Sequence, residues 1–76
     1  MNKKHEVLNL TFDNEYIYLD VDSKNYKVRL EKISEKLTKA DINEKEHYQI
    51  SPSGYGIHWK LLDEDISVQG LLKQAE

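Results

Sequence analysis

Apolar and polar residues alternate along the first part of the chain. Three segments carry an apolar side chain at every second position, the spacing of a strand with one buried face: residues 6–12, 15–21 and 26–30. Polar residues that favour turns separate them at 13–14 and 22–25. The pattern predicts a three-stranded antiparallel meander with one face open to solvent. On this alternation, one face of the first strand holds Leu8, Leu10 and Phe12, and the other holds Val7, Asn9 and Thr11.

Tyr16 and Tyr18 stand opposite the aliphatic residues of the second segment. If their face is open, the two rings, with Tyr26 or Tyr48 nearby, would form an aromatic patch of the kind enriched at protein interfaces. They could equally be the inner layer of the sheet. The alternation leaves both arrangements open.

The hydrophobic period changes after the third segment. Leu30, Ile33 and Leu37 recur at three and four residues among charged side chains, which predicts an amphipathic helix of two to three turns. A short second helix is expected over 41–47, where acidic and amide residues are typical of helix capping.

The stretch 48–72 holds the only Pro, the only Trp and all three Gly. Residues 48–51 and 57–59 predict two strands joined by a Pro- and Gly-containing turn. Ile57 and Trp59 share the buried face of the second strand, and His58 lies on the other. An acidic turn follows, and Ser67 is expected to cap a last helix with the apolar positions Val68, Leu71, Leu72 and Ala75.

Together these elements predict a single α+β domain over residues 1–76. A twisted antiparallel sheet, made of the meander and the later hairpin, carries two or three short helices packed on it. The predicted core comprises Ile33, Leu37, Ile57, Trp59, Leu71 and Leu72. The absence of Cys fits a reducing compartment, and no apolar run approaches the ~20 residues of a membrane span, so a cytoplasmic protein is expected.

The charge balance bears on the kind of partner. The net charge is −3, and the 11 basic residues are interspersed with 14 acidic ones. Binding to nucleic acid requires a basic face, so the balance favours a basic protein over nucleic acid as the partner.

Three consecutive acids and a neighbouring histidine are the candidate chemistry. Asp63, Glu64 and Asp65 could stabilise the start of the last helix or form a partner-binding patch. A metal site is disfavoured because consecutive side chains diverge. His58 is expected to hydrogen-bond Asp63 or Asp65, and no motif of a nucleophile, phosphate loop or paired metal ligands is present.

Four short motifs at the end of the chain carry a family resemblance. The chain resembles a bacterial family known as domain of unknown function 2442 (DUF2442) through Tyr48-Gln49-Ile50-Ser51-Pro52, Gly56-Ile57-His58-Trp59, Leu62-Asp63-Glu64-Asp65-Ile66-Ser67 and Gly70-Leu71-Leu72. It departs from the family at Lys60, where Pro is usual after the Trp, and at Lys45, where an Arg is usual. The resemblance implies no catalytic residues; it implies genes that are often paired in a toxin–antitoxin type of arrangement.

We therefore expect a small non-catalytic protein-interaction module, the antitoxin-like member of such a pair, that binds a basic protein. No catalytic residue, cofactor or metal is expected. The residues expected to bind the partner are Tyr16, Tyr18, His58, Asp63, Glu64 and Asp65. The alternatives are a structural or regulatory domain that assembles with itself through its edge strands, and a small ligand-binding or enzymatic domain.

Overall fold

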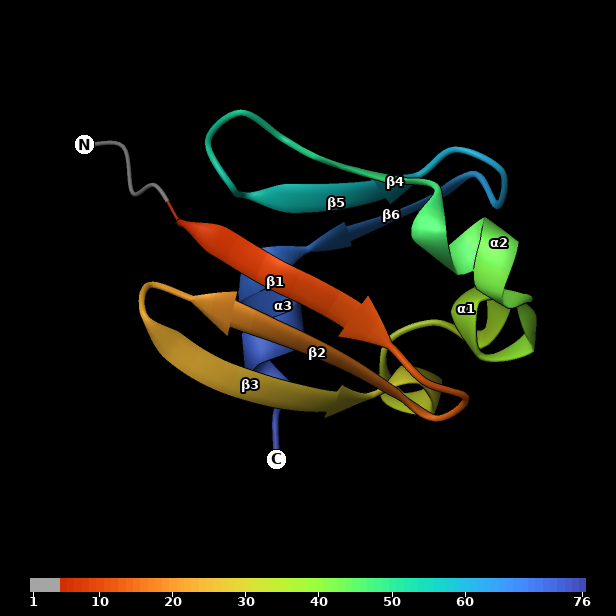
Figure 1. Ribbon diagram of the computed structural model, residues 1–76, viewed down its shortest axis with the longest axis horizontal. Coiled ribbons are helices and arrows are strands. Elements are labelled where there is room, and N and C mark those ends of the chain that lie inside the picture. The colour runs from red at the N-terminus through yellow and green to blue at the C-terminus, as the bar shows by residue number, and fades with distance from the viewer. Residues whose placement is uncertain (1–4) are drawn as a thin grey trace.

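The computed structural model describes residues 5–76, so the first four residues of the predicted domain lie outside the described part. It contains two three-stranded antiparallel sheets and several short helices (Figure 1). The first sheet has the order β1 (Val7–Phe12), β2 (Tyr16–Val21), β3 (Lys24–Arg29). The second has the order β4 (Tyr48–Ile50), β5 (Gly56–Trp59), β6 (Glu64–Ser67). The predicted α+β class is confirmed, but the meander and the later hairpin belong to two separate sheets rather than to one.

The helices are all short. A 3-10 helix, η1 (Leu30–Lys32), and two α-helices, α1 (Glu35–Lys39) and α2 (Ile42–Glu46), connect the two sheets. The last helix, α3 (Val68–Lys73), follows β6 and contacts both sheets.

The predicted meander is present, and its second turn is tighter than expected. Asp22 and Ser23 both have positive φ, at 52° and 71°, and Lys24 already pairs with Val21. Two central residues with positive φ make a hairpin turn whose twist matches that of the flanking strands. The third strand therefore begins two residues earlier than predicted.

The predicted assignment of side chains to the two faces of β1 was wrong at the start of the strand. Between the pairs Leu8↔Asp20 and Thr11↔Tyr18, β1 has one residue more than β2, and Asn9 takes a φ of 53°. This β-bulge reverses the alternation. Leu8 consequently lies on the outer face with 52% of its surface exposed, whereas the residues of β1 that pack against the core are Val7, Leu10 and Phe12.

The predicted helix over 30–37 is interrupted at Ser34. This residue is extended (φ −164°, ψ 119°), and its hydroxyl accepts a hydrogen bond from the Leu37 N–H as the N-cap of α1. Leu30 and Leu37 are nevertheless buried, and Ile33 packs against the core. The apolar spacing correctly identified the inward positions, but a capping residue within it divides the helix.

The other two helices begin where predicted, α2 at the start of the range 41–47 and α3 after the predicted cap Ser67. Asp41 and Glu44 form a reciprocal capping box at the start of α2. Ser67 caps α3 by accepting from the Gly70 N–H at 2.9 Å. A Cβ at Gly70 would lie only 2.7 Å from the Ser67 hydroxyl oxygen, so the glycine makes room for this cap.

The acidic stretch that was predicted as a turn is largely a strand. Asp63, with a φ of 50°, ends the turn, and β6 then pairs with β5 through Trp59↔Glu64 and His58↔Asp65. The predicted hairpin therefore gains a third strand. The strand has no visible alternation because Ile66 is its single apolar residue.

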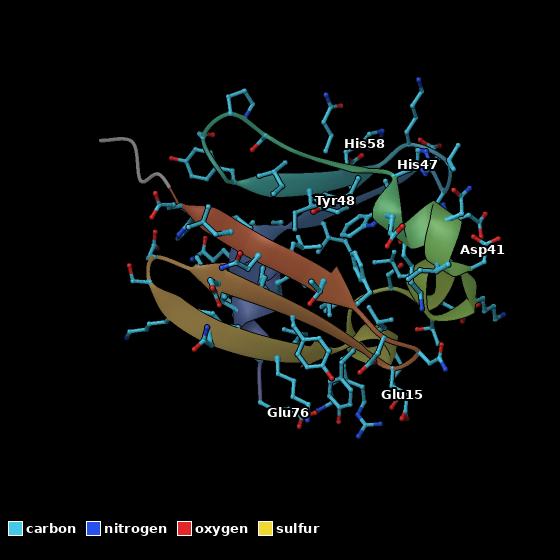
Figure 2. All side chains as sticks on the ribbon, viewed as in Figure 1. Glu15, Asp41, His47, Tyr48, His58 and Glu76 are labelled. Atoms are coloured by element: carbon cyan, nitrogen blue, oxygen red, sulfur yellow. The ribbon has the colours of Figure 1, made fainter. Side chains whose placement is uncertain are left out.

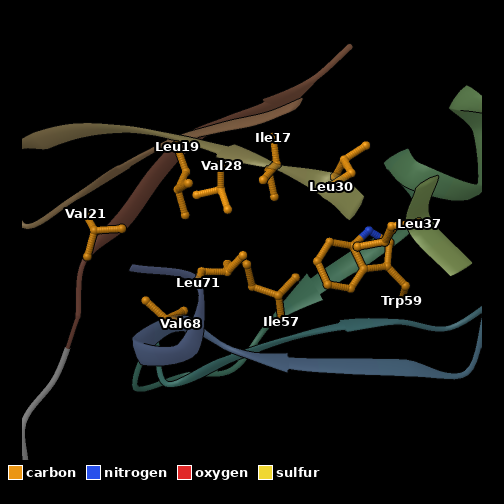
Figure 3. Close-up of a cluster of buried hydrophobic side chains, with 10 residues drawn as sticks. All are labelled: Ile17, Leu19, Val21, Val28, Leu30, Leu37, Ile57, Trp59, Val68 and Leu71. Carbon is orange, nitrogen blue, oxygen red and sulfur yellow. The ribbon is translucent and has the colours of Figure 1, made fainter. Parts of the chain in front are cut away.

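The core lies between the two sheets (Figure 3). Side chains of β2 and β3 point toward those of β5 and α3. Among the residues predicted for the core, four are fully buried and Ile33 and Leu72 are partly buried. The fully buried ones are Leu37, Ile57, Trp59 and Leu71.

Trp59 and Lys45 connect distant parts of the chain. The buried indole N–H donates to the Lys45 carbonyl at 3.0 Å, and the Lys45 ammonium donates to the Asp13 carbonyl at 3.1 Å. Lys45 is itself 4% exposed. At the position where relatives were expected to have an Arg, this lysine thus contacts a backbone carbonyl rather than forming a salt bridge.

Replacing the central indole should unfold much of the population. We expect Trp59→Ala to lower the free energy of unfolding by about 3–5 kcal/mol, because a fully buried aromatic side chain leaves a cavity. Small domains have a total stability of the same order, ~5 kcal/mol. Urea denaturation followed by far-ultraviolet circular dichroism measures the loss. Leu61→Ala, at a side chain that is 52% exposed, is the control and should change it by less than about 0.5 kcal/mol.

Two glycines near the connection from β4 to β5 should respond differently to alanine. Gly54 has a φ of +71°, and a Cβ there would lie 1.8 Å from the His5 carbonyl oxygen, whereas a Cβ at Gly56 meets its nearest atom, the Ile66 carbonyl oxygen, at 3.5 Å. Gly54→Ala should cost more than the ~1–2 kcal/mol of the left-handed conformation alone. Gly56→Ala should be neutral or stabilise by up to about 1 kcal/mol. Equal denaturation midpoints for the two variants would contradict the contact with His5.

Candidate functional site

The outward face of the second sheet is hollowed into a groove. We call it the outer groove; its volume is about 640 Å³ and it is lined by residues 49–52, 55–58 and 65–67. Two rows of side chains cross its floor. Gln49, His58 and Asp65 pair across the three strands, and the next row is formed by Ser51, Gly56 and Ser67.

A histidine–aspartate pair lies in the first row. The His58 Nδ1 is 2.7 Å from an Asp65 carboxylate oxygen, so the expected hydrogen bond to one of the acids is made with Asp65. Their side chains are 40% and 79% exposed. Because Ile57 and Trp59 face the core, the alternation of β5 places His58 outward.

The three acids predicted as one patch have different roles. Glu64 accepts a hydrogen bond from the Ser34 hydroxyl at 2.7 Å and so supports the cap of α1. Asp63 lies in the preceding turn, and Lys36 approaches its backbone carbonyl at 3.4 Å. Asp63 and Asp65 are exposed. The interpretation as the N-terminal charge of the last helix was wrong, because β6 and the Ser67 cap separate the acids from α3.

Tyr16 and Tyr18 lie on the outer face of the first sheet. We call this surface, with Lys27 and Arg29, the tyrosine face. The Lys27 ammonium lies 4.2 Å above the Tyr16 ring, and Arg29 donates to the Tyr16 hydroxyl oxygen at 2.9 Å. Tyr18 donates to an Asp13 carboxylate oxygen at 2.5 Å. The aliphatic residues that alternate with the tyrosines are buried. Of the two arrangements left open by the sequence, the structure therefore has the one with the tyrosines on the outer face.

Tyr26 and Tyr48 do not join the tyrosine face. Tyr26 pairs with Leu19 and packs against the core. Tyr48 belongs to the second sheet, where its ring centroid is 6.0 Å from that of Phe12. The predicted aromatic patch is thus limited to two rings.

The residues expected to bind the partner are therefore divided between two surfaces. His58 and Asp65 line the outer groove, whereas Tyr16 and Tyr18 lie on the outer face of the other sheet. Figure 2 shows His58 near the second sheet, at the top of the view, and Glu76, which contacts Arg29, at the bottom. A single small binding site does not include all six residues.

Sequence reasoning missed three aspartates that organise the first sheet. Asp20 accepts hydrogen bonds from the side-chain amides of Asn9 on β1 and Asn25 on β3, and these bonds lower its pKa. Hydrogen bonds from the Glu6 N–H and His5 likewise lower the pKa of Asp22. The pKa of Asp13 is lowered first by the Tyr18 hydroxyl and then by backbone N–H groups. An Asp within or next to a predicted turn was the available signal.

Residues 5–76 contain neither a cluster of metal-ligating side chains nor a helix that could span a membrane. Within that range, no group of three or more His, Asp or Glu side chains is arranged to hold a metal ion. None of the helices described there has the length and apolar character needed to cross a bilayer.

A second hollow of about 410 Å³ lies between β1 and the start of the second sheet, lined by Leu10, Thr11, Phe12, Glu46 and Tyr48.

Residues 7–76 match the model of the family described as protein of unknown function (DUF2442). The chain belongs to this family. The match spans both sheets, so the DUF2442 region includes the outer groove and the tyrosine face. Neither the curated proteins nor the solved structures include a match to the chain.

The lowered pKa of Asp20 predicts how the stability of the fold changes at acidic pH. A carboxyl group whose pKa is lower in the folded state stabilises the fold above its unfolded pKa, about 3.9, and this contribution is lost as the pH falls through the folded value. Asp20→Asn should therefore be less stable than the wild type at pH 7, and the difference should shrink as the pH is lowered from 7 to below about 3.9. Urea denaturation across this range measures it. A difference that does not depend on pH would refute the role of the charge.

Proposed function

We propose that this member of the DUF2442 family is a small non-catalytic protein-interaction module that binds a basic partner protein. The observation that carries the proposal is the exposure of Asp63 and Asp65, of which Asp65 lines the outer groove. Their negative charge is not used to stabilise the helix that follows, since Ser67 caps it. Exposed charges of one sign steer an oppositely charged partner and accelerate its association.

The role as the antitoxin-like member of a two-gene pair is a finer part of the proposal. It is supported by the family resemblance of the chain rather than by geometry. The net charge of −3 is compatible with it, because an acidic protein suits the neutralisation of a basic one. The protein encoded beside this chain is accordingly the first partner to test.

Self-assembly is the second candidate. The strand order leaves β4 and β6 at the edges of the second sheet, and an edge strand presents unpaired backbone groups to another chain. Sedimentation velocity over a range of protein concentrations separates the two candidates. A stable monomer favours the interaction module, and a concentration-dependent dimer or larger species favours self-assembly.

Charge neutralisation should slow the association with the partner. We expect the double variant Asp63→Asn/Asp65→Asn to lower the on-rate several-fold toward the protein encoded beside this chain, and the salt dependence of the rate to weaken. Surface plasmon resonance at several ionic strengths measures both quantities.

The matched control is Glu64→Gln, which removes one negative charge from the same triplet and is therefore compared with the single variant Asp65→Asn. Because Glu64 bonds to Ser34, Glu64→Gln should lose stability while its on-rate, measured on the folded fraction, changes less than that of Asp65→Asn. An on-rate that is independent of ionic strength for the wild type would refute the proposed electrostatic steering.

A further inference from the structure

We propose that the outer groove binds an extended segment of the partner protein, in which a Lys or Arg stands two residues from an apolar residue. The cation would lie on Asp65 and the apolar side chain beside Tyr55 and Pro52. This inference rests on the proposed function and specifies where the partner binds and which segment it uses.

The spacing of the two rows on the floor suggests an extended segment. The row of Gln49, His58 and Asp65 and the row of Ser51, Gly56 and Ser67 are two residues apart along the strands. At about 3.3 Å per residue, the rows are separated by about 6.6 Å. A segment that runs along the strands in extended conformation repeats its side chains over the same distance, so residues i and i+2 meet successive rows.

The first row favours a cation. Among the residues of 5–76 that line the groove, Asp65 is the one carboxylate, and none is Lys or Arg. His58 contacts one carboxylate oxygen of Asp65, and the side chain is still 79% exposed. The second oxygen can thus accept from an ammonium or guanidinium group, and such charge-assisted hydrogen bonds are among the stronger ones in proteins.

The second row favours an apolar side chain. Gly56 has no side chain to fill the floor, and the Tyr55 ring, which is 44% exposed, stands beside it. The loop that carries the ring is held in place: the Ser51 hydroxyl oxygen accepts from the N–H groups of Tyr55 and Gly56, and Ser53 accepts from the His5 N–H. A preformed wall of this kind reduces the entropy lost on binding.

The tyrosine face does not suit the same segment. Lys27 and Arg29 lie over the Tyr16 ring, so a basic segment would be repelled there. The Tyr16 and Tyr18 hydroxyl groups are moreover already paired, with Arg29 and Asp13. Charge complementarity therefore selects the outer groove.

Titration of the ¹⁵N-labelled protein with capped peptides tests the proposal. The probe is a pentapeptide of the sequence Ser-Arg-Ser-Val-Ser, in which the Arg and the Val are two residues apart, compared with Ser-Glu-Ser-Val-Ser and Ser-Arg-Ser-Gly-Ser. We expect the first to shift the amide resonances of Gln49, Gly56, His58 and Asp65. Both comparison peptides should bind at least about tenfold more weakly, the loss expected for a charged hydrogen bond or for a buried aliphatic side chain.

Variants of the protein locate the two contacts. Asp65→Asn should lower the affinity for the arginine peptide about tenfold. Gly56→Val should abolish binding by filling the floor, and Gly56→Ala, whose Cβ has room, verifies that the backbone tolerates a side chain there. Tyr18→Phe on the tyrosine face is the matched control and should leave the affinity unchanged.

The outcomes separate this inference from the proposed function. If the arginine peptide shifts residues of the tyrosine face, or if the arginine and glutamate peptides bind equally, the groove assignment is wrong. The protein encoded beside this chain could still bind with a salt-dependent rate that Gly56→Val does not change. In that case the groove is not the binding site, and the proposed function as an interaction module is retained. If neither the peptide nor that protein binds, both proposals fail.

Discussion

The hydrogen bond from the Trp59 indole to the Lys45 carbonyl is the interaction on which the rest of the structure depends. A buried indole N–H without a partner would cost free energy, so burial of the ring requires that α2 present this carbonyl. Lys45 in turn donates to the Asp13 carbonyl in the turn between β1 and β2. Through these two bonds, the side chains of Trp59 and Lys45 connect the second sheet to α2 and α2 to the first sheet.

The aromatic contacts of Trp59 reinforce this connection. Its ring centroid is 6.2 Å from that of Phe12 on β1 and 6.5 Å from that of Tyr48 on β4. The candidate site follows from the same arrangement, because β5 is the middle strand of its sheet. Each inward residue that packs in the core leaves its neighbour pointing outward, so the burial of Ile57 and Trp59 places His58 on the floor of the outer groove.

Much of the fold could be predicted from local signals. The alternation of β2 identifies the two sets of side chains that face opposite ways, although it does not say which set is buried, and Ser67 marks the start of α3 by chemistry within a few residues. For the site, the hydrogen bond between His58 and a nearby acid was foreseen, but its place in a groove was not. A groove is formed by side chains from three strands in register, which no single segment specifies.

The sequence by itself determined the α+β class, the buried positions Leu37, Ile57, Trp59 and Leu71, and the cap at Ser67, because each depends on side chains a few residues apart. The tertiary structure decided the features that depend on pairing between distant strands. The bulge that exposes Leu8 exists because β1 has one residue more than its partner segment of β2. Likewise β6, with a single apolar residue, becomes a strand only because β5 offers its free edge, and that pairing brings Asp65 to His58.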